Sequence, residues 1–145
     1  MGSNQGLQEV VMENLLHLFL GVLISKWGDL RKVRFRIHRA TFIHSQEECF
    51  FCNITNLSRN REIEITHLWF DIKPKIHLIN MERPLPKRLK PDEPWETWIP
   101  TRDIPEKYHS NLFYRGCIRL STGANLRSRI DKKVPGYGTV PGATR

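Results

Sequence analysis

The sequence predicts a mainly β protein: an antiparallel β-sandwich of about seven short strands, preceded by one N-terminal hydrophobic helix. Two observations predict this class. The spacing of apolar residues changes from helical to alternate after Lys32, and alternating segments then recur at intervals of roughly 8–15 residues with turn-forming residues between them. A chain of 145 residues is long enough for one domain with its own core.

The hydrophobic helix is predicted over residues 7–30. Apolar residues cover nearly every side of it, and the charge-free stretch from Asn14 to Ser25 is 12 residues long. A membrane-spanning helix usually needs about 20 residues. Three alternatives stay open: a short membrane anchor, a helix buried in the protein or in an oligomer, and a helix lying in the membrane interface.

Flanking charges would orient a spanning helix. Glu9 and Glu13 lie on its N-terminal side, and five basic residues follow it: Lys26, Arg31, Lys32, Arg34 and Arg36. The positive-inside tendency then places the C-terminal domain in the cytoplasm. The three cysteines agree, because an odd number gives no disulfide framework and favours a reducing compartment. The localisation expected is therefore a membrane with the β domain in the cytoplasm, and a soluble cytoplasmic protein is the alternative.

Seven strands are expected, in residues 32–43, 49–58, 61–70, 75–79, 94–100, 112–122 and 124–130. In the first, the alternation slips after His38, which is typical of a β-bulge or of a strand that crosses between sheets. The polar residues between the second and third strands predict a hairpin, and Ser121-Thr122-Gly123 predicts another. In the third strand, Ile63, Ile65, His67 and Trp69 share one face, so Trp69 is expected in the core.

The proline-rich stretch "RPLPKRLKPDEPWETWIP" (83–100) is expected to be a corner and a strand. Its prolines suit a turn and an edge strand, where no ladder N–H is required. A polyproline ligand for an SH3-type partner is the less favoured alternative.

With "NITNLSRNREIEITHLWFD" and "IRLSTGANLRSR...VPG", this stretch resembles small bacterial proteins that have a hydrophobic N-terminal helix followed by one Ig-like β-sandwich. The resemblance covers about residues 33–142. It supports an Ig-like sandwich, which the residue pattern places over 32–131, with residues 1–31 as the helix and the aperiodic, Gly- and Pro-containing residues 132–145 as an extended or disordered tail. It implies no activity and no functional residue.

Residues that could carry chemistry have structural explanations. On a strand, the Cys49 and Cys52 side chains point to opposite faces, and Cys117 alone cannot complete a zinc site. The histidines show no metal-ligand spacing, and no hydrolase or nucleotide-binding motif is present. The two glycosylation sequons at Asn53 and Asn56 are interpreted as strand and turn residues. We expect no cofactor, no metal and no enzymatic activity.

Positive charge is concentrated at the two ends of the predicted sandwich. Segments 26–44 and 112–133 each carry six Lys or Arg and one Asp, and together exceed the net charge of +8 of the whole chain. If the first and last strands lie side by side, six outward arginines form one basic stripe: Arg34, Arg36, Arg115, Arg119, Arg127 and Arg129. Arginines that only protect a sheet edge from aggregation are the competing explanation.

Such a stripe next to a membrane helix suits anionic lipid headgroups, and it would also suit a nucleic-acid backbone. The sequence therefore predicts a non-enzymatic binding or scaffolding module that recognises an unidentified protein partner at the cytoplasmic face of a membrane. The alternative is a basic β domain that binds nucleic acid. Oligomerisation through the N-terminal helix is compatible with either.

Overall fold

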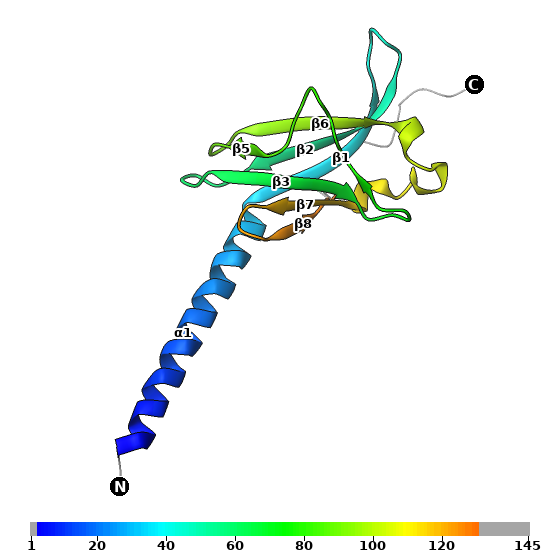
Figure 1. Cartoon of the computed structure of the whole chain (residues 1–145). Coiled ribbons are helices and arrows are strands. Elements are labelled where there is room, and N and C mark those ends of the chain that lie inside the picture. Colours follow the sequence, from blue (N-terminus) through cyan, green and yellow to red (C-terminus); the bar gives the residue numbers. More distant parts are fainter. Residues whose placement is uncertain (1–2, 131–145) are drawn as a thin grey trace, which may run out of the picture.

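The computed structural model describes the backbone of residues 3–130, and the side chains of residues 5–23 and 32–130. One long helix, α1 (Ser3–Arg31), runs into two antiparallel β-sheets (Figure 1). The predicted mainly β class with one N-terminal helix is confirmed. The strands are β1 (Val33–Thr41), β2 (Glu48–Asn56), β3 (Ile63–Phe70), β4 (Ile76–His77), β5 (Lys87–Leu89), β6 (Pro94–Pro100), β7 (Gly116–Leu120) and β8 (Asn125–Arg127). The predicted tail, 132–145, lies outside the described residues.

The first sheet has the order β1-β2-β6. β1 pairs with β2 without a break from Val33–Asn56 to Thr41–Glu48, so the predicted slip in the first strand is wrong. Val33, Phe35 and Ile37 of β1 point into the core, and the next position on the same face is occupied by Arg39, which is exposed. The Arg39 guanidinium lies 5.9 Å from the Phe50 ring centroid and pairs with Glu48, and so closes one end of the core.

The second sheet has the order β4-β3-β7-β8, with β5 also paired to β3. The register of β3 against β7 shifts between Ile65 and His67, where Thr66 is the extra residue of a β-bulge. Beyond the bulge the parity is reversed: Leu68 and Phe70 are buried in the core, and His67 and Trp69 face outward. The expectation that Trp69 is a core residue is therefore wrong.

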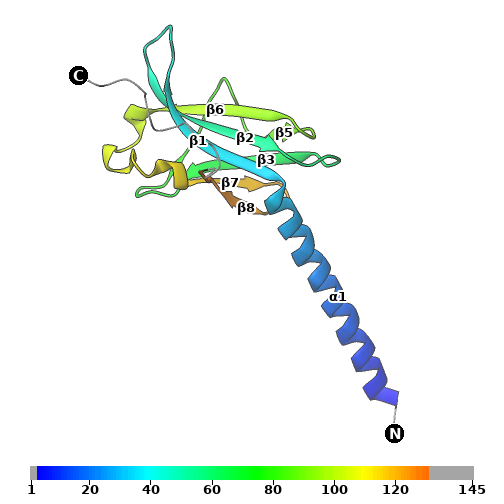
Figure 2. The ribbon, with the colours of Figure 1, turned by 180° about the vertical axis from the view of Figure 1, so that it is seen from behind.

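The two sheets share one hydrophobic core. Phe35, Phe50 and Ile54 from the first sheet lie in the same buried cluster as Leu68 and Ile118 from the second. Figure 2 shows β1 and β2 in one layer and β7 and β8 in the other. At Gly116 the layers approach closely, because a Cβ there would lie 2.8 Å from the Phe35 ring and closer still to Ile37.

The predicted hairpin between the second and third strands is absent, because β2 and β3 belong to different sheets. The connection crosses from one layer to the other, and the side chain of Asn56 fixes it. This buried amide donates to the carbonyls of Arg61 (2.7 Å), Leu89 (3.1 Å) and Lys90 (3.2 Å), and accepts from the backbone N–H of Ser58 (3.0 Å). The main chain of Asn56 also bonds Asp92 and Glu93, so one residue holds two loops and a strand end together.

The corner predicted from the proline-rich stretch is confirmed. Lys90 and Glu93 close a turn in which Asp92 has a positive φ of 61°, and β6 follows at once. The side-chain amide of Asn80 donates a hydrogen bond to the Trp98 carbonyl, with 3.4 Å between nitrogen and oxygen. This carbonyl therefore points away from β2. Pro94 and Pro100 share the parity of Trp98, and their missing N–H groups therefore fall on the free edge of the sheet.

The last predicted hairpin is also confirmed. β7 and β8 pair across Ser121-Thr122-Gly123, where Gly123 has a φ of +84°. The predicted strand 112–122 is shorter than expected, because Leu112–Tyr114 form a 3₁₀ turn and β7 begins at Gly116.

Asn56→Ala is expected to lower the free energy of unfolding by about 3 kcal/mol, because it leaves several buried backbone groups without this partner. Asn53→Ala, which removes one bond to Glu96 from a half-buried position of the same strand, is the control and is expected to cost less than about 1 kcal/mol. Thermal unfolding of the full chain in detergent, followed by tryptophan fluorescence, measures both. Equal losses would contradict the role given to Asn56.

Candidate functional site

The apolar side chains of α1 are uncovered over Gln5–Leu23, the part of the helix whose side chains the structure describes. The stretch Gln5–Leu23 is 19 residues long with a mean hydropathy of 1.2, and none of it is buried. At 1.5 Å per residue it is about 28 Å long, close to the thickness of the hydrocarbon core of a bilayer. The exposed apolar residues include Leu7, Val10, Val11, Met12, Leu15, Leu16, Leu18, Phe19, Leu20, Val22 and Leu23.

These side chains point to all sides of the helix, so α1 has no separate polar face such as an interfacial helix requires. Packing against the rest of this chain is also ruled out for Gln5–Leu23, because that stretch touches no covering surface. Of the alternatives left open by the sequence, a lipid environment or other copies of the helix remain.

The six arginines predicted as one stripe lie in three places. Arg34 and Arg36 are on the outer face of the first sheet, in register with Thr55 and Asn53. Arg119 and Arg127 are on the outer face of the second sheet, in register with Asn125 and Cys117. Arg115 and Arg129 lie near the start of β7, where the backbone N–H of Ser128 donates to the Gly116 carbonyl. Arg115 is half-buried, donates to the Asn111 side chain and the Asp71 carbonyl, and lies over the Tyr108 ring.

The six arginines therefore do not share one face. β1 is an edge of one sheet and β8 is an edge of the other, so their outward side chains face opposite ways. The two edges do meet once, because the backbone N–H of Arg129 donates to the Phe35 carbonyl at 3.0 Å. The predicted site residues therefore form three groups: Arg34 with Arg36 on one outer face, Arg119 with Arg127 on the other, and Arg115 with Arg129 near the start of β7.

The group on the second sheet has a tryptophan at its centre. Trp69 faces outward, with Lys75 Nζ 5.6 Å and the Arg119 guanidinium carbon 5.9 Å from its ring centroid. The His77 ring is 6.3 Å away. We call this set, with Arg127 beside it, the Trp69 surface. Sequence reasoning missed it because the bulge at Thr66 is not visible as a pattern; the only sequence signal is that Leu68 and Phe70 fit the core as well as Trp69 does.

A second aromatic group covers part of the outer face of the first sheet. The Phe42 ring lies 5.1 Å from Phe51 and 5.3 Å from Trp98, and the His38 ring stacks on Phe51 at 5.4 Å. Arg83 lies over Trp98 at 6.0 Å. The neighbouring loops carry the most exposed apolar side chains described in the sandwich: Ile43, Ile79 and Met81.

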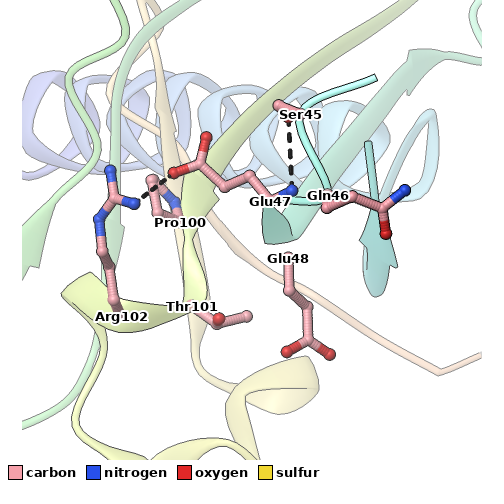
Figure 3. A pocket seen from close by; sticks show the side chains of 7 residues that line it. All are labelled: Ser45, Gln46, Glu47, Glu48, Pro100, Thr101 and Arg102. Carbon is pink, nitrogen blue, oxygen red and sulfur yellow. Dashed lines mark hydrogen bonds and ion pairs between the residues drawn. The ribbon is translucent and has the colours of Figure 1, made fainter. Parts of the chain in front are cut away.

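One shallow hollow of about 470 Å³ lies beside the β1–β2 loop (Figure 3). Its charged walls are already paired: Arg102 bonds Glu47 at 2.7 Å, and Glu48 bonds Arg39. The hydrogen bond from Arg39 lowers the pKa of the Glu48 carboxyl, so this group is a carboxylate at neutral pH and a poor proton donor. Both carboxylates that line the hollow are therefore committed to arginines.

The cysteines are structural in their placement. Cys49 and Cys52 point to opposite faces of the first sheet, as predicted, and both are fully buried. Burial raises the pKa of all three thiols, most strongly that of Cys52. In the described part of the chain, no three His, Cys, Asp or Glu side chains are grouped as metal ligands.

Native protein is therefore expected to react slowly with Ellman's reagent near pH 8, because raised pKa values keep the thiols protonated and the sandwich covers them. Unfolded protein should expose all three cysteines. Ile43→Cys, at an exposed loop position, is the control that must react at once. A native cysteine that reacts as fast as this control would show an accessible thiol and would contradict the structural role.

Comparison of the chain with protein-family models, with curated protein sequences and with solved structures finds no significant match in any of the three.

Proposed function

We propose that this protein is a non-enzymatic binding or scaffolding module of the Ig-like sandwich type, held by α1 at the cytoplasmic face of a membrane. The observation that carries the proposal is the uncovered apolar surface of α1. Eleven or so exposed aliphatic and aromatic side chains in water would cost many kcal/mol, at about 25 cal/mol per Å² of apolar surface. A hydrocarbon environment removes that cost.

Lipid accounts for this helix better than an interface of protein alone. Self-association of helices in water generally uses one apolar stripe, whereas the apolar residues of α1 are distributed over nearly every side of the helix. Glu9 lies near the N-terminal end of Gln5–Leu23, where the headgroup region tolerates charge, whereas Glu13 lies near its middle, where a charged residue costs about 2.5–3.5 kcal/mol. Oligomers that form within the bilayer remain compatible with this arrangement.

The orientation follows from the charges after the helix. Lys26, Arg31 and Lys32 precede β1, and the next outward residues of β1 are Arg34 and Arg36. One residue, Lys32, separates the end of α1 from the start of β1, so the sandwich stays at the membrane surface. Each basic residue close to an anionic leaflet contributes about 1 kcal/mol of attraction.

Binding rather than catalysis fits the surfaces of the sandwich. Its outward groups are cations beside aromatic rings, on both outer faces, and its carboxylates at the hollow are paired with arginines. Surfaces of this composition are typical of protein interfaces, in which aromatic residues and Arg are enriched.

Membrane attachment is tested by fractionation. Full-length protein is expected in the membrane pellet after a high-salt wash, and Leu15→Arg with Phe19→Arg is expected to shift it to the supernatant, because each arginine costs about 2.5–3.5 kcal/mol at mid-membrane. Leu15→Ile with Phe19→Leu, which keeps the apolar surface, should remain in the pellet. A chain beginning at Lys32 should stay soluble. Full-length protein that is soluble without detergent would refute the anchor.

A further inference from the structure

Three cations and one tryptophan gather on the outer face of the second sheet. Lys75 follows β3 in the chain, Arg119 lies on β7 and Arg127 on β8, and all flank the outward side of Trp69 or its neighbour Cys117. Asp71 is the acidic residue among them, and it pairs with Arg127. Lys75 and Arg119 thus give this face a surplus of positive charge.

Arg119 is held in place for binding. Its Nε donates to the Asn125 side-chain oxygen at 3.1 Å, a neutral partner that leaves the guanidinium charge uncompensated. Contact with the Trp69 ring restricts the same side chain. An arginine fixed in this way loses less side-chain entropy on binding a carboxylate, and its planar fork matches a carboxylate's two oxygens.

The spacing of the two cations limits what they can bind. Both lie within 6 Å of one ring centroid, so they are at most about 12 Å apart, which is the span of about three to four residues of extended chain. Two carboxylates at alternate positions of an extended segment lie on one face, about 7 Å apart along the chain, and would satisfy this arrangement.

We propose that the Trp69 surface binds an acidic, extended segment of the partner protein, with one carboxylate on Arg119 and another on Lys75. The inference rests on the proposed function, because it identifies the surface that recognises the partner. Charge complementarity favours an acidic occupant. A nucleic acid is less favoured, because a base stacking on the Trp69 indole would compete with the two cations for its faces.

The test uses the full chain in detergent micelles and a fluorescein-labelled peptide of about ten residues with Glu and Leu alternating. Binding is measured by fluorescence anisotropy. Arg119→Gln is expected to weaken the peptide about tenfold or more, since a charge-assisted hydrogen bond to a carboxylate is lost. Lys75→Gln should weaken it several-fold, and the same peptide with Gln in place of Glu should bind at least tenfold more weakly.

Arg102→Gln is the matched control, because it removes one exposed positive charge, paired with Glu47, from another part of the sandwich. It is expected to leave peptide affinity within about twofold. Equal weakening by Arg102→Gln and Arg119→Gln would show unspecific attraction to net charge and would overturn the inference. So would tighter binding of a single-stranded oligothymidine of about fifteen nucleotides, again reduced by Arg119→Gln, which would assign the surface to nucleic acid.

Failure of this inference is distinguishable from failure of the proposed function. Because Arg119 is on β7, far along the chain from α1, Arg119→Gln should leave membrane fractionation unchanged. Protein that stays in the membrane pellet but does not bind the acidic peptide would refute this inference and leave the membrane anchor standing. Protein that binds the peptide but is soluble without detergent would remove the anchor alone.

Discussion

One extra residue in β3, Thr66, determines which side chains of this strand point into the core and which face outward. Up to Ile65 the odd-numbered side chains point into the core, and beyond Thr66 the even-numbered ones do. The core gains Leu68 and Phe70 in consecutive inward positions, and Trp69 turns outward beside cations from β7 and from the loop between β3 and β4. Without the bulge the same sequence would bury an indole and a histidine and would leave two large apolar side chains in water. Core packing and the Trp69 surface therefore depend on the same backbone irregularity.

The spacing of apolar residues and the turn-forming residues were enough to predict the helix, the antiparallel sandwich and the proline corner, because these features depend on local sequence. The strand period alone predicted that Cys49 and Cys52 face opposite ways. Long-range pairing was not predictable. The polar run after Asn56 looks like a hairpin, but it connects two layers because a buried amide fixes it to Leu89, over thirty residues away. The change of pattern after His38 marks the end of the core, where Arg39 lies over Phe50. The bulge is in β3 instead, at a place where odd- and even-numbered positions both carry apolar residues. The arginines predicted as one stripe lie in separate places because strand parity does not tell which sheet a strand joins.

The molecule has two surfaces of different chemistry at different places in the fold. α1 presents mostly apolar side chains over Gln5–Leu23, whereas the outward groups of the sandwich are mainly cations, aromatics and paired carboxylates. The short link through Lys32 brings these parts close together. In the arrangement that we propose, a basic sandwich tied so closely to a membrane-embedded helix would meet anionic headgroups on one side and would leave other surfaces to proteins.

The environment of α1 is the claim on which this account depends most. A nitroxide attached at Phe19→Cys in bilayer vesicles measures it directly, with Ile79→Cys on the sandwich as the reference, since both positions are exposed on the protein and the native cysteines are buried. We expect the label at residue 19 to relax strongly with molecular oxygen and weakly with a water-soluble nickel complex, and the label at residue 79 to show the reverse. A label at residue 19 that the nickel complex reaches as readily as at residue 79 would place α1 in water and contradict the account.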